Sequence, residues 1–262
     1  MNVTITIATV TYNAENQISN TLKSVAMQSY PLVEHLIIDG LSKDNTLYLV
    51  NNYIKEEKKK KSPHRIVLIS ERDKGIYDAM NKALLKATGN YIVFLNAGDT
   101  LHSANTLTDL FSKIKKEESP TNLPAVLYGE TNIVDEQGKY IRNRRLHTPN
   151  ELNWKSFRKG MLVCHQSFYV RTDVARKVPY NISYRFSSDF DWCVRILKLV
   201  RDEKMLTVNS HLVLTDYLNE GLTTKNHKAS LKERFRIMVK HYGLLTTVIM
   251  HFWFCIRAVV KK

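Results

Sequence analysis

In the segment Tyr91–Thr100, five strand-forming residues lead directly into a short polar turn that carries a carboxylate. A buried strand with Asn96 and Asp99 at its C-terminal end places both where an open α/β sheet binds its ligands. Gly98 has no side chain, so we expect a bulky ligand or a hydrated cation to approach the backbone beside Asp99. One carboxylate suits Mg²⁺ or Mn²⁺ that arrives with a diphosphate, because such ions complete their shell with phosphate and water. The alternative is an Asx-type turn in which Asp99 only caps the next helix.

Three more polar segments follow predicted strands. They are Thr9–Asn13, Asp39–Asp44 and Glu71–Asp78. The C-terminal ends of parallel strands converge on one edge of a sheet, so we expect these segments to meet the 96–100 turn. The third segment combines three carboxylates with Arg72 and Lys74, a mixture that can hold ribose hydroxyls, base edges and phosphates. In the alternative, Asp73 caps the following helix and the other charges are solvated.

The first hundred residues alternate strands with helices. We expect strands at Val3–Thr9, Val33–Asp39, Arg65–Ser70 and from Tyr91, and helices from the loop after Tyr12 to about Gln28, from Asp44 or Asn45 to about Ile54, and over Ile76–Thr88. This alternation predicts a mostly parallel sheet with right-handed crossovers and flanking helices. The charged run at Lys55–Lys61 is typical of a solvated helix end and loop.

The pattern changes after about Pro120. We expect antiparallel strands at Ala125–Asn132 and Gly138–Arg144, a short strand at His165–Arg171, a helix at Asp189–Leu199 and a strand at Thr207–Leu214. Since these elements are few and lack a new repeat, we interpret them as the second side of the same domain.

The composition narrows the classes of function. A formal net charge of +14 over 262 residues implies an acidic partner such as nucleic acid, anionic lipid or a phosphorylated substrate. The cysteines Cys164, Cys193 and Cys255 are far apart. This spacing argues against a zinc site or a disulfide framework and fits a reducing cytosol. The first residues lack a basic segment before an apolar run, so we expect no secretory signal.

Five stretches in this order resemble the family 2 glycosyltransferases, which have the GT-A nucleotide-diphospho-sugar transferase fold. They read TIATVTYNAENQISNTLKSVAMQSYP, EHLIIDGLSKDNT, ERDKGIYDAMNKALLKATGNYIVFLNAGD, CHQSFYVR and SSDFDWCVR. The resemblance is greatest to bacterial enzymes that build capsule, exopolysaccharide or O-antigen repeat units. It implies one α/β GT-A domain over residues 1–227, with a nucleotide-sugar-binding half at 1–120 and an acceptor-binding half at 121–227.

The resemblance also implies roles in the donor half. Thr9, Tyr12 and Asn13 would line the nucleotide base, Asp39 would accept from its N–H, and Glu71, Lys74 and Asp78 would lie around the ribose and diphosphate. The stretch Asn96-Ala97-Gly98-Asp99 matches the metal-binding DxD region of the family. Asn96 replaces the first Asp and Gly98 the second. This leaves Asp99 as the expected ligand of Mg²⁺ or Mn²⁺, and leaves a cation-independent variant open.

In the acceptor half, Asp189 matches the catalytic carboxylate of the family, although Ser188 stands where the family usually has Glu. An acceptor hydroxyl must lose its proton as it attacks the anomeric carbon, and a positioned carboxylate can take it. This single displacement predicts inversion at the anomeric carbon. In a helix Asp191 lies on a different face from Asp189, so only one of them should face the cleft. We interpret Asp191 as a helix-start charge.

Two further segments match the family. His165 and Gln166 occupy a position at its sugar pocket, with an ordinary structural histidine as the alternative. Asn219–Lys225 resembles its Gly-containing loop after the last strand, where Lys225 either reaches the diphosphate or belongs to a simple turn.

Residues 228–262 differ from the rest of the chain. Basic residues at 228–240 precede the uncharged run Gly243–Ile256, and Arg257, Lys261 and Lys262 follow it. The run is shorter than the ~20 residues that span a bilayer. Its basic flanks and Trp253 suit an amphipathic helix lying in an anionic membrane interface, where a lipid-linked acceptor would be found. A helix packed on the domain and a homodimer contact are the alternatives.

The sequence therefore predicts an inverting glycosyltransferase that is cytoplasmic and peripheral at the inner face of the plasma membrane. It would move a sugar from a nucleotide-diphospho-sugar to a hydroxyl of a lipid-linked glycan in bacterial surface polysaccharide synthesis. The alternatives are a nucleotide-sugar-binding protein without transfer activity, a nucleotidyltransferase, and a basic nucleic-acid-binding protein. No nucleic-acid recognition motif is found, so we expect no nucleic-acid partner. No GxGxxG follows Val3–Thr9, which disfavours a dinucleotide oxidoreductase.

Overall fold

The computed structural model describes residues 3–114, 123–219 and 227–260. Within these ranges the strands are β1 (Ile5–Thr11), β2 (Val33–Asp39), β3 (Arg65–Ser70), β4 (Tyr91–Phe94), β5 (Thr100–Leu101), β6 (Val126–Val134), β7 (Tyr140–Asn143), β8 (Phe168–Arg171) and β9 (Thr207–Leu218). The helices are α1 (Ile18–Ala26), α2 (Thr46–Lys59), α3 (Ile76–Lys86), α4 (Thr106–Ser112), α5 (Thr172–Arg176), α6 (Ser188–Asp202), α8 (His227–Tyr242) and α9 (Leu244–Val260), with 3₁₀ turns η2 (Ser156–Lys159) and η3 (His165–Ser167).

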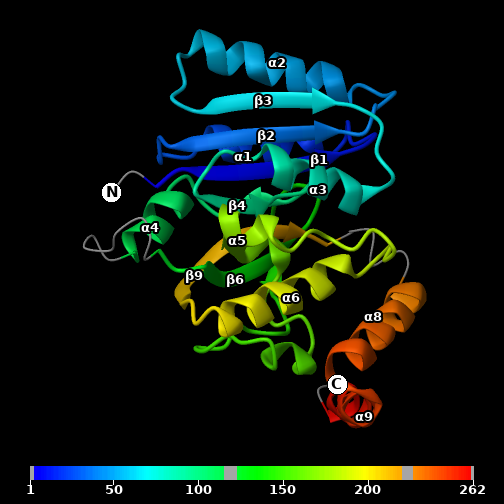
Figure 1. Cartoon of the computed structure of the whole chain (residues 1–262). Helices are drawn as coiled ribbons and strands as arrows, with labels where there is room; N and C mark the ends of the chain where they lie inside the picture. The colour runs from blue at the N-terminus through cyan, green and yellow to red at the C-terminus, as the bar shows by residue number, and fades with distance from the viewer. Residues whose placement is uncertain (1–2, 115–122, 220–226, 261–262) are drawn as a thin grey trace.

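The strands form one sheet in the order β3-β2-β1-β4-β8-β6-β9-β5, with β7 paired to β6 (Figure 1). The first four strands in this order are parallel. The second half is mixed, because β8 is antiparallel to both β4 and β6 whereas β6 and β9 are parallel. This sheet with flanking helices confirms the predicted α/β fold class.

Strand β1 shows why the sheet is central. All of its residues are buried, and successive side chains enter different cores, since strand side chains alternate between faces. Ile5 and Ile7 join a core with α4 residues such as Leu107. Ala8 and Val10 join the core on the other face, which includes Trp192 of α6.

Most predicted elements are confirmed, and the differences have local causes. The bounds of β2 and β3 are as expected, whereas β1 begins and ends two residues later. Helix α2 continues to Lys59 through the run expected to be partly loop, with a Lys59–Glu56 ion pair of 2.9 Å on its last turn. The strand expected from His165 begins only at Phe168, because residues 165–167 form a 3₁₀ turn. The short helices α4 and α5 were not predicted.

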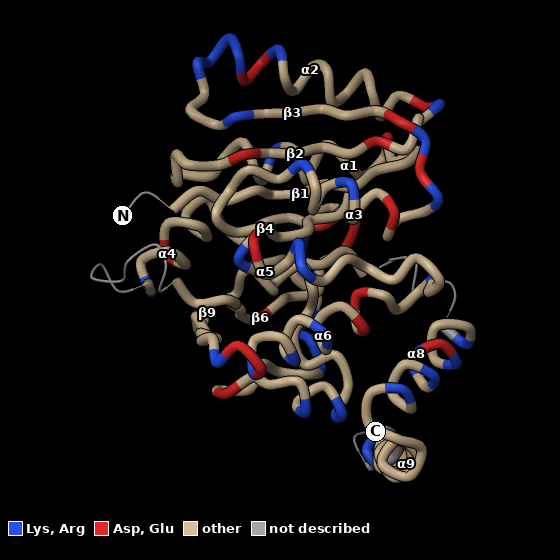
Figure 2. The backbone as a smooth tube through the Cα atoms, viewed as in Figure 1, with Lys and Arg blue, Asp and Glu red and all other residues tan. Residues whose placement is uncertain are grey.

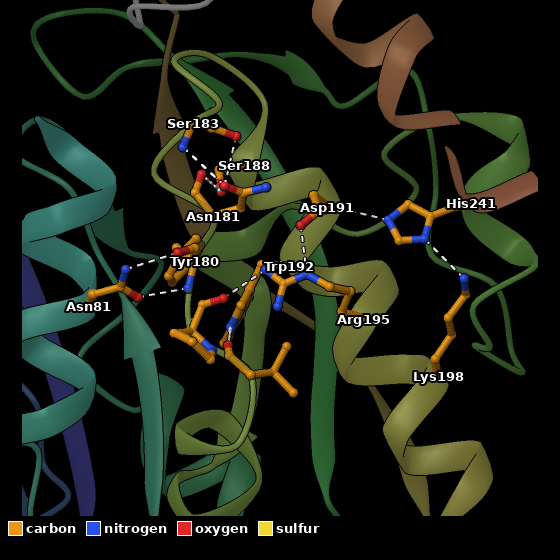
Figure 3. A network of polar contacts seen from close by, with 12 residues as sticks. Asn81, Tyr180, Asn181, Ser183, Ser188, Asp191, Trp192, Arg195, Lys198 and His241 are labelled. Carbon is orange, nitrogen blue, oxygen red and sulfur yellow. Dashed lines mark hydrogen bonds and ion pairs between the residues drawn. The ribbon is translucent and has the colours of Figure 1, made fainter. Parts of the chain in front are cut away.

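Helix α8 packs on the domain through buried Ile237 and Met238 and through two polar contacts. The Glu233 carboxylate accepts the backbone N–H groups of residues 185, 186 and 187, just before α6, at 2.7–2.9 Å. His241 Nε2 lies 2.7 Å from Asp191, which also accepts from Arg195 at 2.6 Å (Figure 3). Asp191 does lie in the first turn of α6, as expected, but it is fully buried and joins α6 to α8.

Candidate functional site

A cavity of about 1090 Å³ opens beside the C-terminal ends of β1 and β4. Its walls come from the segments 10–12, 73–80, 96–97, 164–166 and 184–186, and from single residues that include Ala14, Gln17, Asp99, Ile133, Arg144, Met161, Ile182, Asp189, Tyr217, Leu218 and Arg234. These segments are far apart in the sequence and come from both halves of the sheet (Figure 1). The volume is at or slightly above the upper end of the range usual for sites that bind small molecules.

Nine of the predicted site residues line this cavity. They are Tyr12, Lys74, Asp78, Asn96, Ala97, Asp99, His165, Gln166 and Asp189. The structure therefore brings the 96–99 turn together with Asp189, about ninety residues further along the chain. Of the two acidic residues at the start of α6, Asp189 faces the cavity and Asp191 does not, as the helical spacing predicted.

The other four predicted residues do not line the cavity. Thr9 is fully buried, and its hydroxyl lies 3.0 Å from His35 Nε2. Glu71 is exposed and pairs with Lys82 at 3.1 Å. Asn13 Oδ1 accepts the backbone N–H of Lys43 at 2.8 Å.

Asp39 is fully buried and stabilises the edge of the sheet through hydrogen bonds. Its carboxylate accepts from the backbone N–H and the hydroxyl of Ser42, and from the Ser70 hydroxyl at 2.7 Å. Ser42 Oγ in turn accepts the backbone N–H of Asn13 at 2.9 Å. These bonds fix the loops after β1 and β2, so Asp39 and Asn13 hold the rim of the site without facing the cavity.

The carboxylate of Asp189 is mostly enclosed, with 19% of its side chain exposed. Its Oδ2 lies 3.4 Å from His165 Nδ1, and the Tyr77 hydroxyl donates to its Oδ1 at 3.4 Å. Burial alone would raise the pKa of Asp189. The hydrogen bond from His165 and the positive charge of Arg234 outweigh burial and hold this pKa below its ordinary value. Asp189 is therefore ionised at neutral pH and able to accept a proton.

His165 links Asp189 to the 96–99 turn. Its Nε2 lies 3.4 Å from Asn96 Nδ2, on the side of the ring away from Asp189. The Asn96 amide donates there, which leaves the ring proton on Nδ1, pointing at Asp189. Asn96 Oδ1 is buried and has no hydrogen-bond partner among the described residues.

Asp99 has a different environment in the same cavity. Gln166 Nε2 donates to its Oδ2 at 2.7 Å, and the Leu218 N–H donates to its Oδ1 at 3.1 Å. Burial raises the pKa of Asp99 to about 6, against the opposing effect of these bonds. The described residues contain no group of three or more His, Cys, Asp or Glu able to hold a metal ion.

Gly98 does not line the cavity that Asp99 lines, contrary to expectation. Its φ of +102° is one that residues with side chains rarely adopt, and a Cβ here would lie 2.8 Å from Leu218 Cδ2. The glycine therefore allows the turn and the close approach of β9, which brings the Leu218 N–H to Asp99.

Sequence reasoning missed the cationic side chains of the cavity. Arg144, Arg185 and Arg234 all line it. Arg234 belongs to α8 and appeared in the sequence only as one of several basic residues of the tail. Its 3–4 residue spacing from buried Ile237 and Met238 was the available signal, because residues so spaced share one face of a helix.

Comparisons with known proteins agree with this fold. A family model described as "Glycosyl transferase family 2" matches residues 6–178. A PGL/p-HBAD biosynthesis glycosyltransferase of Mycobacterium bovis is 29% identical over 201 residues, which cover 76% of this chain and 71% of that protein. The Escherichia coli enzyme WfgD, named UDP-Glc:alpha-D-GlcNAc-diphosphoundecaprenol beta-1,3-glucosyltransferase, is 28% identical over 239 residues, or 89% of this chain and 85% of that protein.

Solved structures share the fold at low identity. S. aureus TarS with UDP-GlcNAc superposes with a TM-score of 0.66 at 18% identity, over 90% of this chain and 66% of that chain. The mannosyltransferase PcManGT of Pyrobaculum calidifontis, solved with GDP-Man and Mn²⁺, superposes with a TM-score of 0.60 at 16% identity, over 92% of this chain and 63% of that chain. This chain therefore spans about two thirds of the length of these structures.

Proposed function

We propose that this chain, which belongs to glycosyl transferase family 2 and is a glycosyltransferase, transfers a sugar with inversion of configuration at the anomeric carbon. The acceptor in this proposal is a hydroxyl of a lipid-linked glycan in bacterial surface polysaccharide synthesis. The observation that carries the proposal is one ionised carboxylate, Asp189, that faces a cavity bordered by the C-terminal ends of parallel strands. The lipid-linked acceptor is suggested by the name of WfgD.

The reaction is a single displacement. The acceptor hydroxyl oxygen forms a bond to the anomeric carbon while the bond from that carbon to the diphosphate breaks, and the hydroxyl proton passes to Asp189. Attack from the face opposite the leaving group inverts the anomeric centre. His165 orients the carboxylate through its Nδ1–H, and the cavity arginines place positive charge where the leaving diphosphate becomes more negative.

The donor half supplies a second set of contacts. Tyr12 is 60% exposed and presents its ring to the cavity, where it can stack on the nucleotide base. Lys74 lies on the facing loop, whose shape is fixed by the Asp78 carboxylate accepting the Lys74 N–H at 2.9 Å. We propose that Tyr12, Lys74 and Asp78 hold the nucleotide-diphospho-sugar.

A divalent cation fits this site only together with its donor. Each oxygen of Asp99 already accepts one hydrogen bond but keeps a second lone pair. One such carboxylate suits Mg²⁺ or Mn²⁺ whose other ligands are phosphate and water, and does not suit an ion held by protein alone. We propose Asp99 as its ligand; the ion would supply positive charge to the diphosphate.

Replacing the proposed base tests the reaction. Asp189→Asn keeps the shape of the side chain but cannot take a proton, so transfer should fall about 10²- to 10⁴-fold while donor affinity stays similar. A thermal-shift screen of UDP-, GDP- and dTDP-sugars identifies the donor, and release of its nucleoside diphosphate in the presence of a synthetic GlcNAc-diphospho-lipid measures turnover.

Asp202→Asn is the matched control, because Asp202 lies at the other end of the same helix and is exposed. It should leave turnover unchanged. Equal turnover in Asp189→Asn and the wild type would remove Asp189 as the base. Donor binding with no transfer in the wild type would favour a nucleotide-sugar-binding protein.

The role of Asp99 has a pH signature. Because burial raises the pKa of Asp99 to about 6, protons should compete with Mn²⁺ for this carboxylate, and the gain in nucleoside diphosphate affinity that Mn²⁺ provides at pH 7.5 should be smaller at pH 5. Calorimetry at pH 7.5 and pH 5, with and without Mn²⁺, measures this gain. Asp99→Asn should show no gain at either pH; a full gain in this variant would contradict the metal role.

Helix α9 carries an apolar stripe on its surface. Leu245, Ile249, Phe252 and Ile256 follow helical spacing and are each at least 45% exposed. The opposite face contacts α8, where the rings of His251 and Phe235 are 4.9 Å apart. None of the helices in the ranges that the structure describes is long and apolar enough to cross a membrane.

We propose that this stripe lies in the interface of an anionic membrane. Lys and Arg residues recur along α8 (Figure 2), and Arg257 follows the stripe in the sequence. Each basic residue near an anionic surface contributes about 1 kcal/mol of binding, in addition to the burial of apolar surface. We propose that this docking brings the enzyme to the inner face of the plasma membrane, beside a lipid-linked acceptor.

Charges on the stripe should abolish docking. The variant Leu245→Asp/Phe252→Asp should stay in solution when sedimented with vesicles that contain phosphatidylglycerol, whereas the wild type should sediment. Leu85→Asp is the matched control, because Leu85 on α3 is 75% exposed and Leu245 is 76% exposed. Sedimentation of the double variant like the wild type would refute docking. A wild type that forms dimers and ignores vesicles would assign the stripe to a second copy.

A further inference from the structure

Two cations of the cavity have no anionic partner among the described residues. Arg185 and Arg234 line the cavity, and neither forms an ion pair with any residue in the described ranges. The guanidinium of Arg234 lies 5.4 Å from the ring centre of Phe190, and its Nε is buried without a hydrogen-bond partner. A buried donor left unpaired costs free energy, which a bound acceptor atom would relieve.

The neighbouring carboxylates do not neutralise this charge. Glu233 precedes Arg234 in α8, but both of its oxygens accept backbone N–H groups of residues 185–187. Asp189 responds to the charge of Arg234 through a lowered pKa, yet the two side chains form no ion pair. The positive charge of Arg234 is therefore available to a ligand.

We propose that Arg234 and Arg185 form a subsite for a phosphate or diphosphate ester carried by the acceptor. A guanidinium presents a planar fork of N–H donors that matches phosphate oxygens. The two arginines come from α8 and the loop before α6, whereas the donor contacts Tyr12, Lys74 and Asp78 come from loops after β1 and β3. The inference rests on the proposed transfer to a lipid-linked glycan and names the group that the enzyme recognises.

The surroundings of the pair suit an acceptor that is both charged and apolar. Ile182 and Phe186 line the cavity beside Arg185, and Ile182 is 54% exposed. Helix α8, which supplies Arg234, leads directly into α9 and its apolar stripe. A saccharide joined through diphosphate to a lipid has phosphate for the arginines and a chain for the apolar surfaces. The leaving diphosphate of the donor has the same phosphate chemistry, so it is the alternative ligand of the two arginines.

Binding of inorganic pyrophosphate to the full chain tests the subsite. Loss of a charge-assisted hydrogen bond should weaken the affinity of Arg234→Gln about ten- to hundredfold in calorimetry. Arg236→Gln is the matched control, since Arg236 lies on the same helix, is exposed and does not line the cavity; its affinity should equal that of the wild type. Arg234→Lys keeps the charge without the fork and should lose part of the affinity even if Arg234→Gln fails to fold.

Two further titrations test this subsite. One distinguishes a phosphate of the acceptor from the diphosphate of the donor, and the other separates the subsite from the catalytic role of Asp189. If pyrophosphate binds to enzyme that is already saturated with the tightest-binding of UDP, GDP and dTDP, the subsite belongs to the acceptor. If pyrophosphate and this nucleotide exclude each other, the subsite belongs to the donor and the assignment is overturned. Asp189→Asn should bind pyrophosphate at least as well as the wild type, so failure of the catalytic proposal leaves this test intact. Equal affinity in the wild type and in both Arg234 variants overturns the subsite.

Discussion

Keeping a carboxylate charged inside a mostly enclosed cavity costs free energy, because burial disfavours the ionised form. At Asp189 this cost is offset by the ring N–H of His165 and by the positive charge of Arg234. The three residues belong to α6, η3 and α8, so the partners that keep this buried carboxylate charged surround it only when these elements are docked together. The contacts of Glu233 and His241 that hold α8 against α6 and the loop before it therefore support the proposed catalytic carboxylate as well as the fold.

Two carboxylates of the same cavity are shifted in opposite directions. Burial dominates at Asp99 and raises its pKa to about 6, whereas partners dominate at Asp189 and lower its pKa. Pairs of acidic groups whose environments separate their pKa values commonly carry different roles. Here Asp189 is suited to accept the proton of the acceptor hydroxyl. Asp99 is suited to hold β9 in place and to bind a cation that arrives with the diphosphate.

The parts of the site that depend on local sequence were predictable. The apolar runs Leu36–Ile38 and Ile66–Ile69 marked β2 and β3, and the polar turn after β4 pointed to Asn96 and Asp99. The turn at 165–167 was not predictable, because bonds from distant residues shape it: the Thr215 hydroxyl donates to the Gln166 carbonyl, and the Gln166 side chain bonds to Asp99. Arg234 was taken for one of several basic residues of the tail, because contacts with distant residues decide which face of α8 packs on the domain.

A crystal structure of the enzyme with the donor identified by the binding screen tests the central claim most directly, because it shows where the reacting carbon lies. The account predicts the nucleotide against Tyr12 and Lys74 and the anomeric carbon facing Asp189, with room between them for an acceptor hydroxyl. A donor bound outside this cavity, or with its sugar turned away from Asp189, would contradict the account.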